Sequence, residues 1–192
     1  MNTLMNKKNS LVVRSKKNSQ RGIALLETVI ALAVLLVVTV GVMSLAGVAI
    51  STTENQGHLQ ARTAEYAQDK MEQLLALTFC DGQTDTTVFP AANSGGTGLA
   101  GCNGTFPAQT PATGGNLSIT APAAGYVDYV DGNGNPVAQS ANWQYIRVWQ
   151  VTAPAGTNLL KQISVKCQVR NAVGATTLAP NATVVSLKSY PF

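Results

Sequence analysis

The stretch that decides the fold is residues 20–50, which read QRGIALLETVIALAVLLVVTVGVMSLAGVAI. Glu27 is the one acid in this run, and the 26 residues from Thr28 to Thr53 carry no charged side chain. About 20 consecutive apolar residues are enough to cross the hydrocarbon core of a membrane as a helix. We therefore expect residues 23–53 to form a transmembrane helix. Glu27 needs an explanation, because charged side chains inside such helices are rare and usually functional.

The charges of the 192-residue chain are distributed unevenly along it. Six of the 13 basic residues and none of the 9 acidic residues precede Ile23. Positive charges beside a membrane helix keep that end in the cytoplasm, so we expect a cytoplasmic N-terminus and an extracytoplasmic domain over residues 54–192. The basic balance belongs to the N-terminal tail, and the body has no basic cluster of the kind that binds nucleic acid. We expect no nucleic-acid partner.

Two simple explanations of the apolar run leave part of the pattern unexplained. A secretory signal peptide has an apolar region of only about 7–15 residues before a small-residue cleavage site. Gly47-Val48-Ala49 could serve as that site, but the run is longer. A plain single-span anchor accounts for the length of the run but not for Glu27.

A third explanation accounts for both features. Arg21-Gly22 comes directly before Ile23, and three small or apolar residues separate Ile23 from Glu27 at the head of the apolar run. This arrangement resembles the signature of type IV prepilins. The resemblance implies that a prepilin peptidase removes residues 1–22 as a basic leader by cutting between Gly22 and Ile23. It also implies that the new amine of Ile23 is methylated. Ile23 stands where phenylalanine is more usual, and the leader is rather long.

The position of Glu27 so close to the cleavage site has a physical reason in this interpretation. Cleavage creates an α-amino group with a pKa near 8, which is mostly positive at neutral pH. Two opposite charges 4 Å apart attract by about 4 kcal/mol at an effective dielectric constant of 20. We expect Glu27 to be the assembly carboxylate, paired with the amine of Ile23 in its own chain or in a neighbouring subunit.

The helix is predicted to continue well beyond the apolar run, because the first proline in the chain is Pro90. Spacings of three and four residues place a largely apolar stripe on one face of an amphipathic helix. This stripe consists of Leu59, Thr63, Tyr66, Ala67, Lys70, Met71, Leu74, Leu77 and Thr78. We expect one helix over residues 23–77, with a protruding apolar first half and a second half that packs by this stripe on a globular body.

The rest of the chain is predicted to be a long loop followed by strands. Residues 80–115 are rich in Gly, Thr, Ala and Pro, as surface loops are. Candidate strands lie in residues 116–123, in residues 125–152 as two strands and a turn, in residues 161–170 and in residues 182–190. The clearest is 161–170, whose strict alternation of apolar and polar residues indicates one buried and one solvent-exposed face. The expected fold class is α+β, a long N-terminal helix with a small antiparallel sheet over residues 116–192.

Two segments of the body resemble the PilV-type minor pilins of the type IV pilin family. They are the helix residues Ala61 to Leu75 with AQDKMEQLLAL, and the strand pattern YxRxWxV of residues 145–151 followed by LKxIxV of residues 160–165. The resemblance implies a structural subunit in type IV pilus assembly, initiation or modification. Its expected partners are the prepilin peptidase, other pilin subunits through their N-terminal helices, an inner-membrane assembly platform and, before assembly, membrane lipid. Its expected location is the bacterial inner membrane before assembly and the pilus fibre, periplasm or cell surface afterwards.

Two alternative functions remain open at this point. The I-type minor pseudopilins of type II secretion systems share much of the same sequence pattern. A single-span membrane-anchored binding or adhesion domain, with residues 80–115 as its contact surface, would also have a long apolar helix and an extracytoplasmic body.

The three cysteines, Cys80, Cys102 and Cys167, lie in the part of the chain that is expected outside the cytoplasm, where disulfides persist. Cys80 and Cys102 are the closest pair in sequence, and a disulfide that closes such a loop could contribute about 3 kcal/mol. Cys167 lies on the apolar face of the clearest strand, where a free cysteine behaves as a small hydrophobic residue. We expect a Cys80–Cys102 disulfide and a free Cys167. A bridge through Cys167 and the lack of any bridge are the alternatives.

No catalytic residue, metal site or cofactor is expected, and we do not expect an enzyme. Asp131-Gly-Asn133-Gly-Asn135 resembles the start of a calcium loop, but Pro136 occupies the position that needs glycine. We interpret this segment as a hairpin turn. His58 is the one histidine of the chain, and we interpret it as a solvated or interfacial helix residue.

Overall fold

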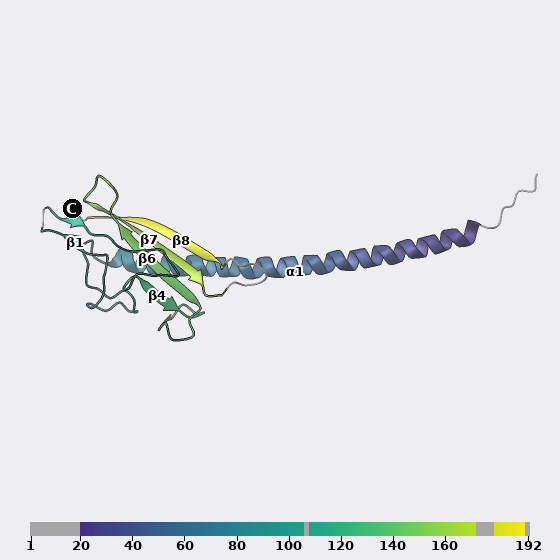
Figure 1. Cartoon of the computed structure of the whole chain (residues 1–192), viewed down its shortest axis with the longest axis horizontal. Helices are drawn as coiled ribbons and strands as arrows, with labels where there is room; N and C mark the ends of the chain where they lie inside the picture. Colours follow the sequence, from purple (N-terminus) through teal and green to yellow (C-terminus); the bar gives the residue numbers. More distant parts are fainter. Residues whose placement is uncertain (1–19, 106–107, 172–178, 191–192) are drawn as a thin grey trace, which may run out of the picture. The chain divides into compact units, whose positions relative to one another are not determined.

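The structure, a computed structural model, describes residues 20–105, 108–171 and 179–190, with only the backbone of residues 20–22. These residues form one helix and two antiparallel sheets (Figure 1). The chain divides into two compact units between Ala49 and Ile50. The fold is therefore α+β, as expected.

The first unit contains the apolar part of α1, which spans Gln20–Ala76 as a single helix of 57 residues. Every side chain from Ile23 to Ile50 is exposed. The hydroxyls of Thr28, Thr39 and Ser44 donate hydrogen bonds to the carbonyls three residues earlier, at 2.8–2.9 Å. Because these polar groups are satisfied within the helix, the helix surface from Thr28 to Ile50 is apolar on all sides. Among the described residues, α1 is the one helix long and apolar enough to span a membrane.

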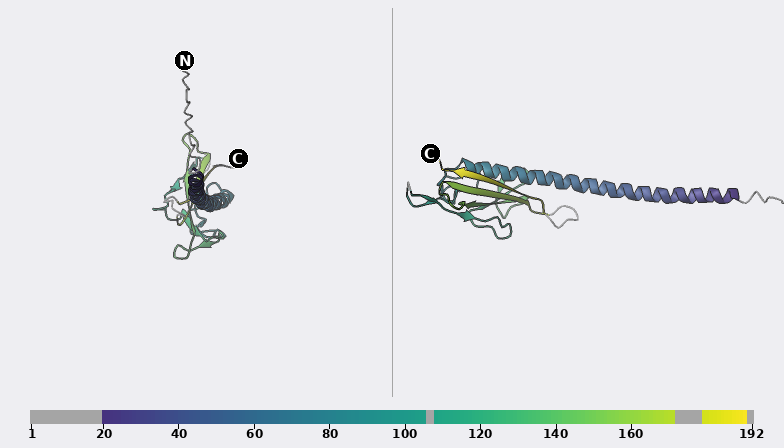
Figure 2. Two further views of the ribbon diagram at one scale, coloured as in Figure 1. Left: turned by 90° about the vertical axis from the view of Figure 1, so that its right-hand side faces the viewer. Right: turned by 90° about the horizontal axis from the view of Figure 1, so that it is seen from above.

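The second unit packs the end of α1 beside a six-stranded antiparallel sheet. The sheet order is β5-β4-β6-β7-β8, and β3 also pairs with β6. β6, β7 and β8 lie side by side along this part of α1 (Figures 1 and 2). The strands are β3 (Gly114–Gly115), β4 (Val127–Val130), β5 (Pro136–Val137), β6 (Tyr145–Thr152), β7 (Leu160–Val169) and β8 (Asn181–Ser189). A separate two-stranded sheet pairs β1 (Cys102–Asn103) with β2 (Thr110–Pro111).

The core lies between α1 and the inner face of the sheet. On β6 and β7, alternate residues point inward, and the register pairs Trp149 with Val165 and Val151 with Ile163. All four are fully buried, and each large apolar side chain contributes about 1.5–3 kcal/mol when it is buried. The predicted helix stripe is confirmed from Leu59 to Leu77. The buried members are Thr63, Tyr66, Ala67, Lys70, Met71 and Leu74, while Leu59 and Leu77 pack at the margin. Thr78 is exposed because α1 ends at Ala76.

The outer face of the sheet carries a second, smaller apolar cluster of Tyr129, Ile146 and Val148. Leu117 and Ile119 pack on this cluster from the connection between β3 and β4. The prediction of a strand over residues 116–123 is wrong. The Asn116 side chain accepts a hydrogen bond from the Ser118 amide at 3.0 Å, and the Ser118 hydroxyl accepts one from the Ala121 amide at 3.2 Å. These local bonds offer the backbone an alternative to a strand ladder.

The other predicted strands are present. Residues 125–152 contain β4, the short β5 and β6, residues 161–170 contain most of β7, and residues 182–190 contain most of β8. The loop over residues 80–115 is less irregular than expected, because it includes β1, β2 and β3. β3 joins the main sheet opposite Val151 and Gln150, so the sheet begins before residue 116.

The disulfide joins Cys80 and Cys102, as expected. It connects the segment that follows α1 to β1, and so closes the base of the loop between them. Cys167 is free and buried on the inner face of β7. Burial raises the pKa of its thiol to about 12. Since the thiolate is the reactive form of cysteine, Cys167 is protected both sterically and electronically.

We predict that Cys167 reacts with a maleimide only after the protein unfolds. In the full chain in detergent at pH 7.5, mass spectrometry should show no label without denaturant and one label in denaturant. Peptide mapping without reduction should recover Cys80 joined to Cys102. Rapid labelling of the folded protein, or a bridge that contains Cys167, would contradict the prediction.

Candidate functional site

The first candidate site is the start of α1, where sequence analysis places the cleavage junction Gly22–Ile23 and the carboxylate of Glu27. Ile23 is 66% exposed, and Glu27 is also exposed. Residues four apart lie on the same face of a helix, so Glu27 lies one turn beyond Ile23. In the described part of the chain the Glu27 side chain has no hydrogen-bond or ion-pair partner. The structure therefore places an unpartnered carboxylate on an otherwise apolar helix surface.

The second unit contains a buried ion cluster that joins α1 to the sheet. Asp128 of β4 lies between Lys70 of α1 and Arg147 of β6. Its carboxylate accepts two hydrogen bonds from the Arg147 guanidinium, at 2.7 and 2.8 Å, and one from Lys70 Nζ at 2.8 Å. All three side chains are at most 3% exposed. Charge-assisted and bidentate hydrogen bonds of this kind are the strongest class in proteins.

The cluster extends to the loop and to the helix backbone. Lys70 Nζ also donates to the carbonyl of Thr86 and lies 4.3 Å from the centre of the Trp149 ring. Arg147 donates to the carboxylate of Asp69 at 3.0 Å. Burial lowers the pKa of Lys70, although Asp128 opposes this shift. Burial also acts to lower the pKa of Arg147. The negative charges and hydrogen bonds of Asp128 and then Asp69 act more strongly in the opposite direction, so the pKa of Arg147 is raised.

A second buried cation, Lys161, fastens the disulfide-closed loop to β7. Its ammonium donates to the carbonyl of Leu99 at 2.8 Å and to the carbonyl of Gly101. The ring of Phe79 lies 5.0 Å away. Burial lowers the pKa of Lys161 to about 8, although Asp81 acts in the opposite direction. The loop is therefore held to the sheet by hydrogen bonds in addition to the disulfide.

The segment after Asp131 forms the hairpin turn between β4 and β5. The Asp131 carboxylate accepts hydrogen bonds from the amides of Asn133 and Asn135 at 2.8 and 2.9 Å. The hydrogen bond from the Asn135 side chain, and then these amide contacts, lower the pKa of Asp131. Gly134 has a φ of +84°, and an added Cβ would lie 2.8 Å from the Tyr66 ring. Glycine at this position lets the turn pack on α1, where the Tyr66 hydroxyl donates to the Gly132 carbonyl at 3.0 Å.

Sequence analysis did not predict the ion cluster. Across residues 20–105, 108–171 and 179–190 no group of three or more acidic, histidine or cysteine side chains could hold a metal ion, and His58 is exposed on α1. The available signal was Lys70 inside the apolar helix stripe together with Arg147 among the inward residues of β6. Two inward cations require a buried anion.

No family model, curated protein or solved structure matches the chain. The functional argument therefore depends on the residues and contacts described above.

We predict that Asp128→Asn destabilises the folded body by about 3–5 kcal/mol, because it leaves buried Lys70 without its anion and buried Arg147 with only the half-exposed Asp69. Asp69→Asn is the matched control. The Asp69 side chain is 55% exposed, and an exposed ion pair contributes at most about 1 kcal/mol. Urea unfolding of the full chain in detergent, followed by tryptophan fluorescence, measures both. Equal losses in the two variants would contradict the prediction.

We predict that Lys161 makes stability rise with pH above about 8. The folded pKa of about 8 lies below the usual value of 10.5, so between these values the unfolded state binds more protons and a rise in pH favours the folded state. The neutral amine keeps two N–H donors for the two carbonyls. The unfolding free energy of wild type minus that of Lys161→Met should therefore increase from pH 8 to pH 10. The contribution of Cys167 cancels in this difference. A constant or falling difference would contradict the prediction.

Proposed function

We propose that this chain is a minor pilin-like structural subunit that acts in the assembly, initiation or modification of a type IV pilus. In this proposal a prepilin peptidase removes residues 1–22, the amine of Ile23 is methylated, and the mature subunit is held in the inner membrane by the apolar part of α1. It is then extracted into a fibre or into the complex at the tip of the fibre.

The observation that carries the proposal is Glu27, which has no partner among the described residues and lies on the exposed apolar surface of α1, four residues after Ile23. A charged side chain at the centre of a bilayer costs about 2.5–3.5 kcal/mol on insertion scales, and near the interface it costs less. Cleavage after Gly22 would supply the missing partner, because it creates a positive amine one helical turn away. The two groups can then neutralise each other within a subunit or between neighbouring subunits.

The mechanism in this proposal is helix packing. Large contiguous apolar surfaces are not left in water and mark contacts with membranes or other proteins. Between Ile23 and Ile50 this surface can be covered by lipid before assembly and by the same segment of other subunits afterwards. Head-to-tail contacts that do not close into a ring produce an open helical polymer, which is the geometry of a fibre.

The alternatives make different predictions for the N-terminus and for the location of the chain. A minor pseudopilin of a type II secretion system would have the same processed N-terminus, but would act in a secretion system. A membrane-anchored binding or adhesion domain would keep its full N-terminus and remain in the membrane.

We predict that the mature protein begins at Ile23 with a methylated amine. Intact-mass and N-terminal mass spectrometry of membrane-extracted protein decide this point. A start at Ile50 would indicate a secretory signal peptide, and a start at Met1 would indicate a plain anchor. Either result would contradict the proposal.

We predict that Glu27→Gln leaves insertion and cleavage largely intact but lowers the amount of this subunit in sheared fibres. The amide keeps nearly the same shape and removes the negative charge that balances the amine. Glu54→Gln is the matched control, because it removes the same charge from an exposed position of the same helix. Mature mass and abundance in sheared fibres should be compared for both variants. Incorporation of Glu27→Gln at the wild-type level would refute the pairing.

A further inference from the structure

The loop between Cys80 and Cys102 carries a run of exposed apolar residues. Residues 88–92 read VFPAA, and every one of them is exposed. Val88 is 44% exposed and Phe89 is 62% exposed. Runs of about four exposed apolar residues are avoided on protein surfaces unless they have a function. This run therefore needs a functional explanation.

The run is held in a fixed position on the body. Asp85 and Ala92 exchange two backbone hydrogen bonds at its base, at 2.8 and 3.1 Å. The carbonyl of Thr86, just before the run, accepts a hydrogen bond from Lys70 of α1. A surface that is ordered before binding loses less conformational entropy when a partner docks. These contacts therefore present the run as a preformed surface.

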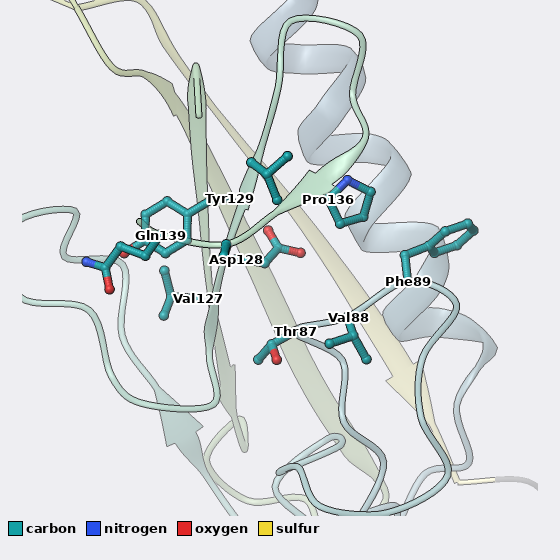
Figure 3. A pocket seen from close by; sticks show the side chains of 10 residues that line it. Thr87, Val88, Phe89, Val127, Asp128, Tyr129, Pro136 and Gln139 are labelled. Atoms are coloured by element: carbon teal, nitrogen blue, oxygen red, sulfur yellow. The ribbon is translucent and has the colours of Figure 1, made fainter. Parts of the chain in front are cut away.

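A hollow of about 510 Å³ lies beside this run (Figure 3). Loop residues 87–89 form one side of it, and residues 136–139, which include β5, form another. Between them lie residues 127–129 of β4. Most of the lining side chains are apolar, so the hollow suits an apolar side chain of a partner.

The hollow also contains one open backbone position. The carbonyl of Tyr126 accepts a hydrogen bond from Trp149 of β6. Backbone groups of alternate residues in an antiparallel strand point to opposite sides, so those of Val127 point away from β6. Tyr129 is the next residue that points this way, and it is already paired with Val137 of β5. In the described part of the chain no strand pairs with Val127 on this side, which leaves room for one residue of an extended segment.

The rim of the hollow is acidic. The partly exposed carboxylate of Asp85 accepts hydrogen bonds from the amide and the hydroxyl of Thr87, at 2.9 and 2.7 Å, and Thr87 lines the hollow. On the β5 side, the partly exposed carboxylate of Asp131 accepts one from the amide of Asn135 at 2.9 Å. Residues 80–139, which supply the whole lining, contain no basic residue.

The ion cluster behind the hollow does not change the sign of this charge. Asp128 lines the hollow, but its carboxylate is buried and bonds Lys70 and Arg147. With Asp69, the cluster contains two cations and two carboxylates. The exposed charge at the rim is therefore that of Asp85 and Asp131. Because complementary charge steers association and selects partners, this rim favours a cationic partner.

We propose that the hollow binds an extended polypeptide segment of a partner protein, in which an apolar residue is flanked by basic residues. The apolar side chain enters the hollow and contacts Val88, and the backbone of the same residue pairs with Val127. The basic side chains reach the carboxylates of Asp85 and Asp131. In this mode of peptide recognition, main-chain hydrogen bonds provide affinity and side-chain pockets provide specificity. The inference requires only a folded body, so it does not depend on the proposed function.

The test uses the full chain in nanodiscs of phosphatidylcholine and fluorescent synthetic peptides with blocked ends. The probe is Lys-Val-Leu-Val-Lys, and its matched control is Glu-Val-Leu-Val-Glu. Fluorescence anisotropy, corrected for discs without protein, should show about tenfold tighter binding of the basic peptide, because two exposed ion pairs replace two repulsive contacts. The double variant Asp85→Asn with Asp131→Asn should lose most of this preference. Asparagine keeps an oxygen for the amide hydrogen bonds but removes the charge.

Val88→Ser tests the hollow itself. Val185→Ser is the matched control, because Val185 is 55% exposed on β8 and does not line the hollow. Val88→Ser should weaken binding of the basic peptide about fivefold, since apolar contact area is lost, and Val185→Ser should leave it unchanged. Lack of maleimide label on Cys167 shows that each variant is folded.

Several outcomes would overturn the proposal. They are equal affinity for the two peptides, equal effects of the two serine variants, and binding no tighter than to discs without protein. Dimerisation of the chain that depends on Val88 would identify a second copy as the occupant, and would also overturn it.

Discussion

The arrangement of the body depends on one buried carboxylate. Asp128 bonds a cation from α1 and a cation from β6, so its loss would leave both charges without an anion in the core. The ion cluster joins one position of α1 to one position of β4 and one of β6, so it defines the register of the helix on the sheet. We infer that hydrophobic burial supplies most of the stability of this interface and that Asp128 supplies its specificity.

Much of this architecture could be predicted from the sequence because the patterns are local. The length of α1, the inward stripe ending near Leu77, and β7 with its alternating faces all follow from periodicity within one element. The disulfide followed from sequence proximity. The ion cluster did not, because its partners are 58 and 19 residues apart in sequence, and no short-range pattern joins them. Residues 116–123 were wrongly assigned to a strand because β-prone Leu117 and Ile119 outweighed the turn-forming Asn116 and Ser118.

The start of α1 shows the opposite situation. Gly22, Ile23 and Glu27 are expected site residues because their arrangement resembles the prepilin signature, and the structure adds that the Glu27 side chain has no partner in the described part of the chain. One helix thus meets two environments. Before Ile50 its side chains are exposed on every face, whereas around Lys70 even a cation is buried and bonded. The first buried residue of α1 is Thr63, well beyond the boundary between the two compact units.

The loop between Cys80 and Cys102 is fixed to the body at its base and also at Thr86, whose carbonyl bonds Lys70, and at Thr97, whose hydroxyl bonds the Gly125 carbonyl. The disulfide closes it, Lys161 holds the carbonyls of Leu99 and Gly101, and the Asp85–Ala92 bridge begins its outer part. Residues 93–95, beyond that bridge, are exposed. Because loop-closure entropy grows only slowly with loop length, a short peptide inserted there would lengthen the tip without disturbing the sheet. The tip is therefore a permissive position for an epitope tag, and a place where sequence can diverge without loss of the fold.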